Sequence, residues 1–264
     1  MNRLAIVMVL ALAACGKKAA QDQPAATAAG IKVAAASDLE FAFREIGAQF
    51  EKQTGKTVTF TFGSSGNLAK QIAQGAPYDV YAAANAAFVD DTVKAGACDG
   101  ATKAMYARGR IVLWTKKSDG PAAPASLADL KDERFKKIAI ANPEHAPYGK
   151  AAKQAMEKLG IWDTLQPKLV FGENIQQTLH FAQSGNADAA IAALSLALKA
   201  DDGTYILIDD SLHAPLDQAL AACKNGTSID LGKQFAAFVS SPGGHEIMKR
   251  YGFLLPGETL AKTQ

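Results

Sequence analysis

From Ile31 onward, two kinds of hydrophobic pattern alternate along the chain. Short runs of apolar and β-branched residues are typical of strands, and longer runs with an apolar residue at every third or fourth position are typical of amphipathic helices. The recurring order of strand and then helix favours an α/β fold with mostly parallel sheets. Strands are expected within residues 31–37, 56–65, 78–84, 108–118, 136–144, 168–173, 188–195 and 204–209, and helices within residues 39–55, 66–76, 85–98, 127–135, 148–160, 175–184, 231–241 and 242–252.

These elements form two sets, separated by the Pro/Ala/Ser stretch DGPAAPAS. We therefore expect two lobes with cores of their own, for which the chain is long enough. The last two helices have no strands beside them in the sequence, so they are expected to return to the first set. Lobe 1 then comprises residues 31–112 and 217–264, and lobe 2 residues 113–216. The chain crosses twice between the lobes, near 110–114 and 210–216, and two crossings make a hinge.

The first thirty residues have a different character. Arg3 precedes an apolar run, and Leu12-Ala13-Ala14-Cys15 ends it with small residues before a cysteine. This pattern predicts a signal peptide over residues 1–14 that is cleaved before a lipidated Cys15. The alternative is an ordinary secretion signal with an incidental cysteine. Residues 15–30 are polar and Ala-rich, which predicts a flexible linker. The protein is therefore expected to be exported and anchored to a membrane through lipid alone.

Composition narrows the range of partners. The chain has 28 Lys and Arg against 26 Asp and Glu, a net charge of +2, which predicts binding neither to nucleic acid nor to an anionic membrane surface. Apart from Cys15, the chain contains Cys98 and Cys223. In an oxidising compartment these two form a disulfide or remain as two buried thiols, and the sequence leaves both open.

Motifs of common enzyme classes are absent from the sequence. Neither GxSxG nor a Walker A loop occurs, and the four histidines show no metal-ligand spacing. We therefore expect no enzymatic activity, no catalytic residues and no cofactor. His145 is expected to orient its own loop by hydrogen bonding, and Trp114 and Trp162 are expected to be packing residues.

Four strand-to-helix junctions share one chemical character. They are Ser37-Asp38, Ser64-Ser65-Gly66-Asn67, Pro147-Tyr148-Gly149 and Asn174-Ile175. The first turn of a helix has unpaired N–H groups and the positive end of the helix dipole, and it binds anions without Lys or Arg. Together the junctions predict an anion site at the carboxyl ends of the strands. The alternative is that Ser and Asn only cap their helices.

Asp38 is the exception in this neutral set, because a carboxylate repels a dianion. We expect its side chain to point outward from the first helical turn, where it stabilises the helix dipole. The alternative is a carboxylate in the site that accepts a proton from a protonated oxyanion.

Several segments also resemble a known family. AAASDLEFAFREI, FGSSGNLAKQI, GAPYDVYAAAN, NPEHAPYGKAAKQAMEKLGIWDTL and KRYGFLLP are similar to the periplasmic molybdate-binding proteins of ABC transporters, over residues 31–256. The resemblance implies a two-lobe, type II periplasmic-binding-protein fold with a two-strand hinge. It also implies a monomer at the periplasmic face that binds molybdate, or tungstate, as an oxyanion and delivers it to an ABC permease.

The resemblance further implies which residues hold the oxyanion. Ser37 and Ser65 supply hydroxyl and N–H donors from lobe 1, and Tyr148 and Ile175 supply N–H donors from lobe 2. Some members add a tyrosine hydroxyl, but here that position is Ala193, so a donor is missing. The additional candidates beside these four residues are Asp38, Ser64 and Gly66.

Three other functions stay open at this point. A different oxyanion, sulfate or phosphate, suits the same donors. A phosphate-ester hydrolase on the same scaffold is a second alternative, since a fold does not determine a function. The third is a sensor that contacts a receptor in place of a permease.

Overall fold

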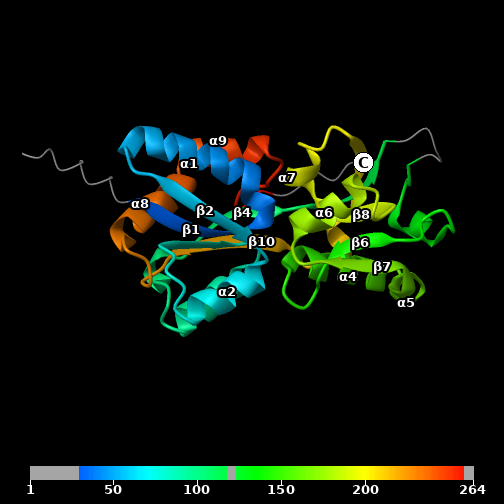
Figure 1. The fold of residues 1–264 in the computed structure, drawn as a ribbon, viewed down its shortest axis with the longest axis horizontal. Helices are drawn as coiled ribbons and strands as arrows, with labels where there is room; N and C mark the ends of the chain where they lie inside the picture. The colour runs from blue at the N-terminus through cyan, green and yellow to red at the C-terminus, as the bar shows by residue number, and fades with distance from the viewer. Residues whose placement is uncertain (1–29, 118–122, 259–264) are drawn as a thin grey trace, which may run out of the picture.

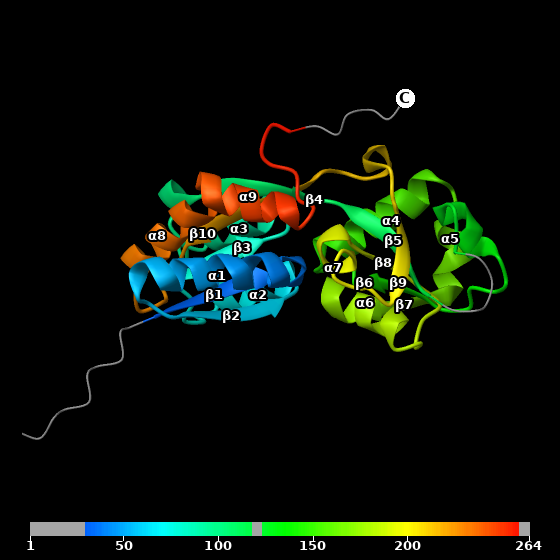
Figure 2. The same cartoon turned by 90° about the horizontal axis from the view of Figure 1, so that it is seen from above.

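The structure, a computed structural model, describes residues 30–117 and 123–258 and consists of two α/β lobes side by side (Figures 1 and 2). Each lobe contains a five-stranded sheet, in the orders β2-β1-β3-β10-β4 and β7-β6-β8-β5-β9. The predicted two-lobe α/β fold is confirmed. The predicted signal peptide, Cys15 and most of the linker lie outside the described residues. Within them, no helix has both the length and the apolar character that crossing a membrane requires.

Lobe 1 contains the N-terminal elements and the C-terminal helices. Its strands are β1 (Ile31–Ala36), β2 (Val58–Gly63), β3 (Val80–Ala83), β4 (Ala104–Gly109) and β10 (Leu216–Ala222). Its helices are α1 (Glu40–Thr54), α2 (Ser65–Ala73), α3 (Ala86–Lys94), α8 (Ile229–Val239) and α9 (Pro242–Arg250), with 3-10 turns at Ser37–Leu39 and Gly100–Thr102. Helices α1, α8 and α9 lie on one side of the sheet and α2 on the other (Figure 1).

Lobe 2 contains the middle of the chain. Its strands are β5 (Ile111–Lys116), β6 (Ile138–Ala141), β7 (Leu169–Gly172), β8 (Ala189–Ala193) and β9 (Gly203–Leu207). Its helices are α4 (Pro147–Lys158), α5 (Trp162–Leu165), α6 (Ile175–Gln183) and α7 (Leu194–Ala197), with 3-10 turns at Leu127–Lys131, Gln166–Lys168 and Asp210–Leu212. Helices α4 and α5 lie on one side of this sheet and α6 and α7 on the other (Figure 1).

Both sheets are mixed in the same way. Neighbours among β1, β2 and β3, and among β6, β7 and β8, pair in parallel. Strand β10 pairs antiparallel with β3 and β4, and β5 pairs antiparallel with β8 and β9. The reversed strand in each sheet is the one through which the chain enters from the other lobe. Ile111 and Val112 pair with β8, so they belong to the second sheet and not to lobe 1, where we had placed them.

Small side chains let helices pack closely on both faces of the central strands. All five residues of β8, Ala189–Ala193, are buried, as expected for a strand covered on both sides. The largest buried side chains are aromatic. Phe43 and Phe235 pack with their ring centroids 6.1 Å apart in lobe 1, and Trp114 is fully buried in lobe 2. Trp114 is thus a core residue, as its sequence context predicted.

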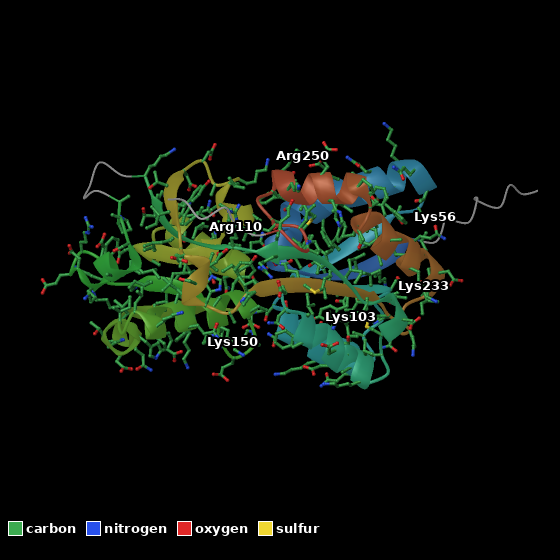
Figure 3. The ribbon with its side chains drawn as sticks, turned by 180° about the vertical axis from the view of Figure 1, so that it is seen from behind. Lys56, Lys103, Arg110, Lys150, Lys233 and Arg250 are labelled. Carbon is green, nitrogen blue, oxygen red and sulfur yellow. A yellow bond between two sulfur atoms is a disulfide. The ribbon has the colours of Figure 1, made fainter. Side chains whose placement is uncertain are left out.

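The first chain crossing is a single residue, Arg110, between β4 and β5. Arg110 lies where the two lobes meet (Figure 3), and its Nε and Nη2 donate to the carbonyl of Gly252 at 3.2 and 3.1 Å. Gly252 follows α9 and has a φ of 81°, a conformation that favours glycine. A Cβ there would lie 2.9 Å from Leu194 of α7 and from Leu198, which follows that helix. The end of lobe 1 therefore packs against lobe 2 beside the hinge.

Two local features complete the fold. Cys98, after α3, and Cys223, after β10, form a disulfide in lobe 1 with their Cα atoms 3.8 Å apart. Ser126 and Asp129 form a capping box, but the helix expected over residues 127–135 is only the 3-10 turn Leu127–Lys131. The turn ends at Asp132, whose extended backbone breaks the hydrogen-bond ladder.

Candidate functional site: a cavity lined by hydrogen-bond donors between the lobes

The four predicted helix starts converge between the lobes. Ser37 follows β1, Ser65 follows β2, Tyr148 follows β6 and Ile175 follows β7, so all four stand at carboxyl ends of parallel strands. They border one small cavity of about 190 Å³, a volume that includes space open to solvent. The cavity is lined by Ala36, Ser37, Asp38, Gly63, Ser64, Ser65, Ala84, Ala146, Pro147, Tyr148 and Ile175. No Lys, Arg or His is among these lining residues.

Lobe 1 contributes two serine hydroxyls. Ser37 is 2 % exposed, and its Oγ has no hydrogen-bond partner among the described residues. A buried hydroxyl without a hydrogen-bond partner is costly. A ligand in the cavity can supply the partner that Ser37 Oγ lacks. The Oγ of Ser65 accepts a hydrogen bond of 3.0 Å from the N–H of Ala84, which leaves its own hydrogen available. The hydroxyl of Tyr81 donates to the Ser65 carbonyl at 2.7 Å and fixes this turn.

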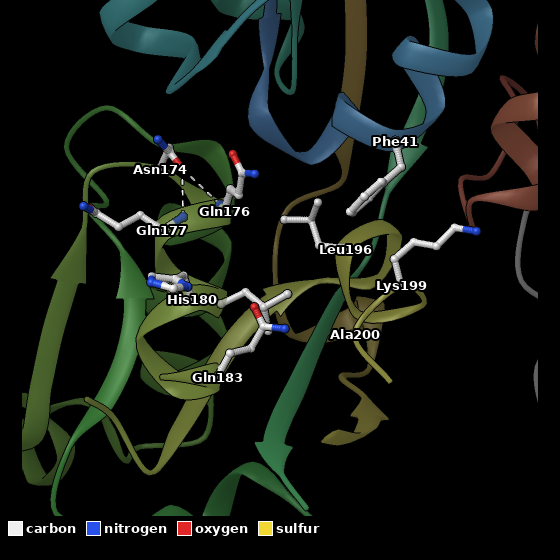
Figure 4. Close-up of a pocket in the computed structure, with 10 residues that line it drawn as sticks. Phe41, Asn174, Gln176, Gln177, His180, Gln183, Leu196, Lys199 and Ala200 are labelled. Atoms are coloured by element: carbon white, nitrogen blue, oxygen red, sulfur yellow. Dashed lines mark hydrogen bonds between the residues drawn. The ribbon is translucent and has the colours of Figure 1, made fainter. Parts of the chain in front are cut away.

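Lobe 2 contributes backbone N–H groups. Pro147 occupies the first turn of α4, where its missing N–H costs nothing, and the N–H of Tyr148 follows it. At the start of α6, the Asn174 side chain accepts from the N–H groups of Gln176 and Gln177, both at 3.0 Å (Figure 4). This cap leaves the preceding N–H, that of Ile175, without a partner in the described structure. Asn174 thus caps its helix and still leaves one donor at the cavity.

Figure 4 also shows that a separate surface groove lies beside α6 and α7. Phe41 of lobe 1 and Leu196 of lobe 2 border it, together with Lys199. The groove shares none of its lining residues with the cavity.

Asp38 does not point outward as we expected. It is 1 % exposed, and its Oδ2 accepts hydrogen bonds from Tyr148 Oη at 2.8 Å and from Gln218 Nε2 at 2.6 Å. Gln218 accepts in turn from Tyr106 Oη at 2.9 Å, so the carboxylate belongs to a buried polar network. The expectation was wrong because these partners lie far away in the sequence and reach the first helical turn only in the folded state.

The network changes the acidity of its members. Burial raises the pKa of Asp38 from 3.8 to about 6, although the hydrogen bonds from Gln218 and Tyr148 act in the opposite direction. Burial, together with the negative charge of Asp38, holds the pKa of Tyr106 and Tyr148 well above the usual value. Among the described residues, Oδ1 of Asp38 is buried without a hydrogen-bond partner, like Ser37 Oγ beside it in the chain. Two neighbouring residues of the cavity wall therefore have unsatisfied polar atoms.

Ser64 and Gly66 differ from the other candidates. Ser64 lines the cavity, but its Oγ lies 2.6 Å from the carbonyl of His145 and 2.7 Å from His145 Nδ1. The N–H of Gly66 donates to the same carbonyl at 2.9 Å, and Gly66 is not among the lining residues. His145 therefore contacts the other lobe in addition to its own loop, which is more than the sequence predicted.

Ser64 and His145 are not arranged as a nucleophile and its base. Such a pair requires the serine hydroxyl to donate its hydrogen to the imidazole. A carbonyl only accepts, so the one hydrogen of Ser64 is directed to His145 O and is not available to the imidazole. The described residues also contain no group of His, Cys, Asp and Glu able to hold a metal ion. The cavity chemistry therefore suits binding of an anion through hydrogen bonds.

Ala193 stands at the position where we expected a tyrosine hydroxyl donor to be missing. It is buried at the end of β8 and is not among the residues that line the cavity. Two residues later, Ser195 donates to the backbone carbonyl of Asp38 at 2.7 Å and so joins the lobes. We had not singled out Ser195, Gln218 or Tyr106, because nothing in their local sequence distinguishes them from core residues.

Comparisons with known proteins agree on one family. A model described as bacterial extracellular solute-binding protein matches residues 31–254. The molybdate-binding protein ModA of Rhodobacter capsulatus is 37 % identical over 255 residues, which is 95 % of this chain and 94 % of the relative. ModA of Azotobacter vinelandii is 32 % identical, over 96 % and 97 %. A solved structure of the A. vinelandii periplasmic molybdate-binding protein superposes with a TM-score of 0.80 at 29 % identity and covers 86 % of this chain and 99 % of that one.

Proposed function

Because this chain belongs to the family of bacterial extracellular solute-binding proteins, we propose that it captures molybdate, and also tungstate, between its lobes and delivers the oxyanion to the permease of an ABC importer. Exported binding proteins of this kind carry their ligand as cargo, so no cofactor and no catalytic step are part of the proposal. Its relatives that bind molybdate match the chain over nearly their whole length.

The observation that carries the proposal is the convergence of uncharged donors on one cavity. Ser37 and Ser65 supply hydroxyls from lobe 1, and Tyr148 and Ile175 supply backbone N–H groups from lobe 2. A fully deprotonated dianion offers acceptors only, so a cavity of donors suits it without a counter-charge. The aligned dipoles of α4 and α6 add positive potential at the same place.

Selectivity follows from the fixed geometry of the donors. They sit on helix starts that are held by the sheets, so the radius of the closed cavity does not adapt freely to its ligand. A larger tetrahedral oxyanion reaches donors of both lobes at once, whereas a smaller one leaves some of them unpaired, which is costly in a buried site. We therefore place molybdate and tungstate ahead of sulfate.

The carboxyl group of Asp38 favours phosphate as a second candidate ligand. Its buried Oδ1 has no partner in the part of the chain that the structure describes, and an ionised carboxylate is an acceptor for a ligand that carries a proton. Molybdate instead suits an Asp38 that is protonated, and the raised pKa of about 6 lowers the cost of that form. The two ligands thus require opposite protonation states of this one carboxyl group.

The anchoring of the protein is a further part of the proposal. The Leu12 to Cys15 pattern supports a lipid on Cys15, and the polar residues after it support a flexible tether to the membrane. The folded lobes would act as a monomer at the periplasmic face. Because Cys15 and residues 16–29 lie outside the described structure, this part rests on the sequence.

A thermal-shift panel tests the ligand assignment. The lipid-free protein is heated in the presence of equal concentrations of molybdate, tungstate, sulfate or phosphate. A ligand at about 100 times its dissociation constant stabilises the native state by about 2.7 kcal/mol, which raises the Tm by several degrees. We expect molybdate and tungstate to raise the Tm and sulfate and phosphate to leave it nearly unchanged. A shift with phosphate that exceeds the molybdate shift contradicts the assignment.

A further inference from the structure

Ser64 precedes α2 in the position of a capping residue, but it does not cap the helix. No side-chain hydrogen bond joins its hydroxyl to the first turn of α2. The hydroxyl instead donates to the carbonyl of His145 in lobe 2, across the cleft, at 2.6 Å, and Ser64 is buried. A serine in this position normally satisfies an N–H of its own helix. Here its hydrogen bond belongs to the contact between the lobes.

Gly66 completes the same contact from the first turn of α2. Its N–H donates to the His145 carbonyl at 2.9 Å, so this oxygen accepts two hydrogen bonds from lobe 1. A Cβ on Gly66 would lie 2.8 Å from the carbonyl oxygen and 3.1 Å from His145 Cα. These are backbone atoms, which do not yield as the end of a flexible side chain does. The approach of the two segments therefore requires glycine at this position.

From this geometry we infer that the His145 carbonyl is a latch that holds the lobes closed, and that Ser64, Gly66 and His145 are positioning residues for oxyanion capture. The inference rests on the proposed function only in the identity of the ligand. It gives Ser64 and Gly66 a role that differs from the one expected from the sequence, because their donors are directed to the partner lobe and not to the oxyanion.

The latch is placed where it sets the geometry of the cavity. His145 lies three residues before Tyr148, whose N–H stands at the start of α4. When the carbonyl of His145 is held by α2, this N–H is brought opposite Ser37 and Ser65. Two polar contacts at the rim, Asn67 with Glu173 and Gln176 with Glu40, also join the lobes, but their residues are more exposed.

The latch consists of protein groups alone, so it acts in the empty protein as well. A ligand that binds only the closed state has an apparent affinity proportional to the closed fraction. Any contact that favours closure therefore tightens binding without touching the ligand. Loss of the latch should both weaken ligand binding and open the empty protein. Loss of an oxyanion donor should weaken binding without opening the empty protein.

The test is Gly66→Ala, with Gly243→Ala as its matched control. Gly243 is likewise the second residue of its helix, α9, but a Cβ there meets nothing closer than 3.9 Å. Alanine favours a helix over glycine, so any effect of Gly66→Ala is expected at the contact between the lobes and not in α2 itself. Molybdate affinity is measured by calorimetry, and the radius of gyration of the ligand-free protein by small-angle X-ray scattering.

We expect Gly66→Ala to weaken molybdate binding at least ~10-fold and to increase the ligand-free radius of gyration, with Gly243→Ala unchanged in both. Equal affinity and equal radius in Gly66→Ala and the wild type overturn the latch. If the wild type binds no molybdate, the proposed function fails, and the radius of gyration alone decides: a larger value in Gly66→Ala supports the latch and an equal value overturns it.

His145→Ala separates the carbonyl from the imidazole. This variant keeps the carbonyl that accepts from Ser64 and Gly66 and removes only the ring that contacts Ser64 through Nδ1. We expect a smaller loss of affinity than in Gly66→Ala. A larger loss in His145→Ala overturns the assignment of the latch to the carbonyl.

Discussion

The hydroxyl of Tyr148 in lobe 2 donates a hydrogen bond of 2.8 Å to Oδ2 of Asp38 in lobe 1, and both side chains are buried. The same oxygen accepts from Gln218 on β10, the strand that returns from the hinge. A Cβ on Gly109, the residue before the crossing at Arg110, would overlap the Tyr148 hydroxyl. The Tyr148 side chain therefore belongs to the cavity wall, lies beside the hinge and joins the two lobes.

The stability of the fold should depend on the ionisation of Asp38. Burial raises its pKa from 3.8 to about 6, so the folded state binds this proton more tightly than the unfolded chain does. The cost of ionising the buried carboxyl is absent below about pH 4, grows between about pH 4 and 6, and reaches roughly 3 kcal/mol above pH 6. Asp38→Asn should therefore raise the free energy of unfolding at pH 7.5.

Urea denaturation of both proteins at pH 7.5 and at pH 4 measures this effect. The advantage of Asp38→Asn should be mostly lost at pH 4, where the folded wild-type carboxyl is protonated and the unfolded one is about half protonated. A difference between the two proteins that is the same at both pH values contradicts the role given to burial.

The two serine hydroxyls should differ in what their loss does to the empty protein. Ser37→Ala and Ser65→Ala each remove one donor to a charged acceptor, so each should weaken molybdate binding by roughly 1.5 to 3 kcal/mol, or about 10- to 100-fold. Ser65 Oγ also accepts from the Ala84 N–H, whereas Ser37 Oγ has no partner in the described structure. Only Ser65→Ala should lower the Tm of the ligand-free protein.

Ser240→Ala is the control for the serine variants, because the Ser240 Oγ is also buried without a partner in the described residues but lies away from the cavity. It should leave the affinity for molybdate unchanged. Unchanged affinity in both Ser37→Ala and Ser65→Ala shows instead that the oxyanion binds elsewhere.

The disulfide between Cys98 and Cys223 should contribute strongly to stability. The two residues are 125 positions apart, and closing so long a loop in the unfolded chain is worth about 5 kcal/mol in the loop-entropy account. Guanidinium denaturation with and without a reductant measures the contribution, and the double variant Cys98→Ser, Cys223→Ser should match the reduced protein. Alkylation of both thiols in unfolded, unreduced protein contradicts the bond.

Membrane attachment should depend on Cys15. Cys15→Ser removes the thiol that the lipid would occupy, so the variant should leave the membrane fraction or remain unprocessed. Cell fractionation and the intact mass of the wild type decide this. A wild type that is fully soluble and has no acyl mass contradicts the anchor.

The helix starts around the cavity could be predicted from the sequence because their signals are local. Pro147 and Asn174 stand next to the N–H groups they leave free, and each junction follows a recognisable strand. Asp38 could not be placed in this way. Its orientation is decided by Tyr148, 110 residues away, and by Gln218, 180 residues away.

Two other differences have similar physical causes. Ser64 and Gly66 are residue types that suit an anion site, and only the fold shows that a carbonyl from the other lobe occupies their donors. Strand β4 (Ala104–Gly109) was not predicted as a separate strand, because none of its residues is β-branched and Arg108 and Gly109 lack the apolar character of the other strands. It pairs with β10 at the edge of its sheet, where that character is needed least.

Calorimetric titration of the lipid-free wild type with molybdate, followed by sulfate and phosphate under the same conditions, tests the central claim most directly. The account predicts one molybdate per chain, bound at least ~100-fold more tightly than sulfate, because the larger dianion reaches the donors of both lobes at once. Sulfate or phosphate binding that equals or exceeds molybdate binding contradicts it.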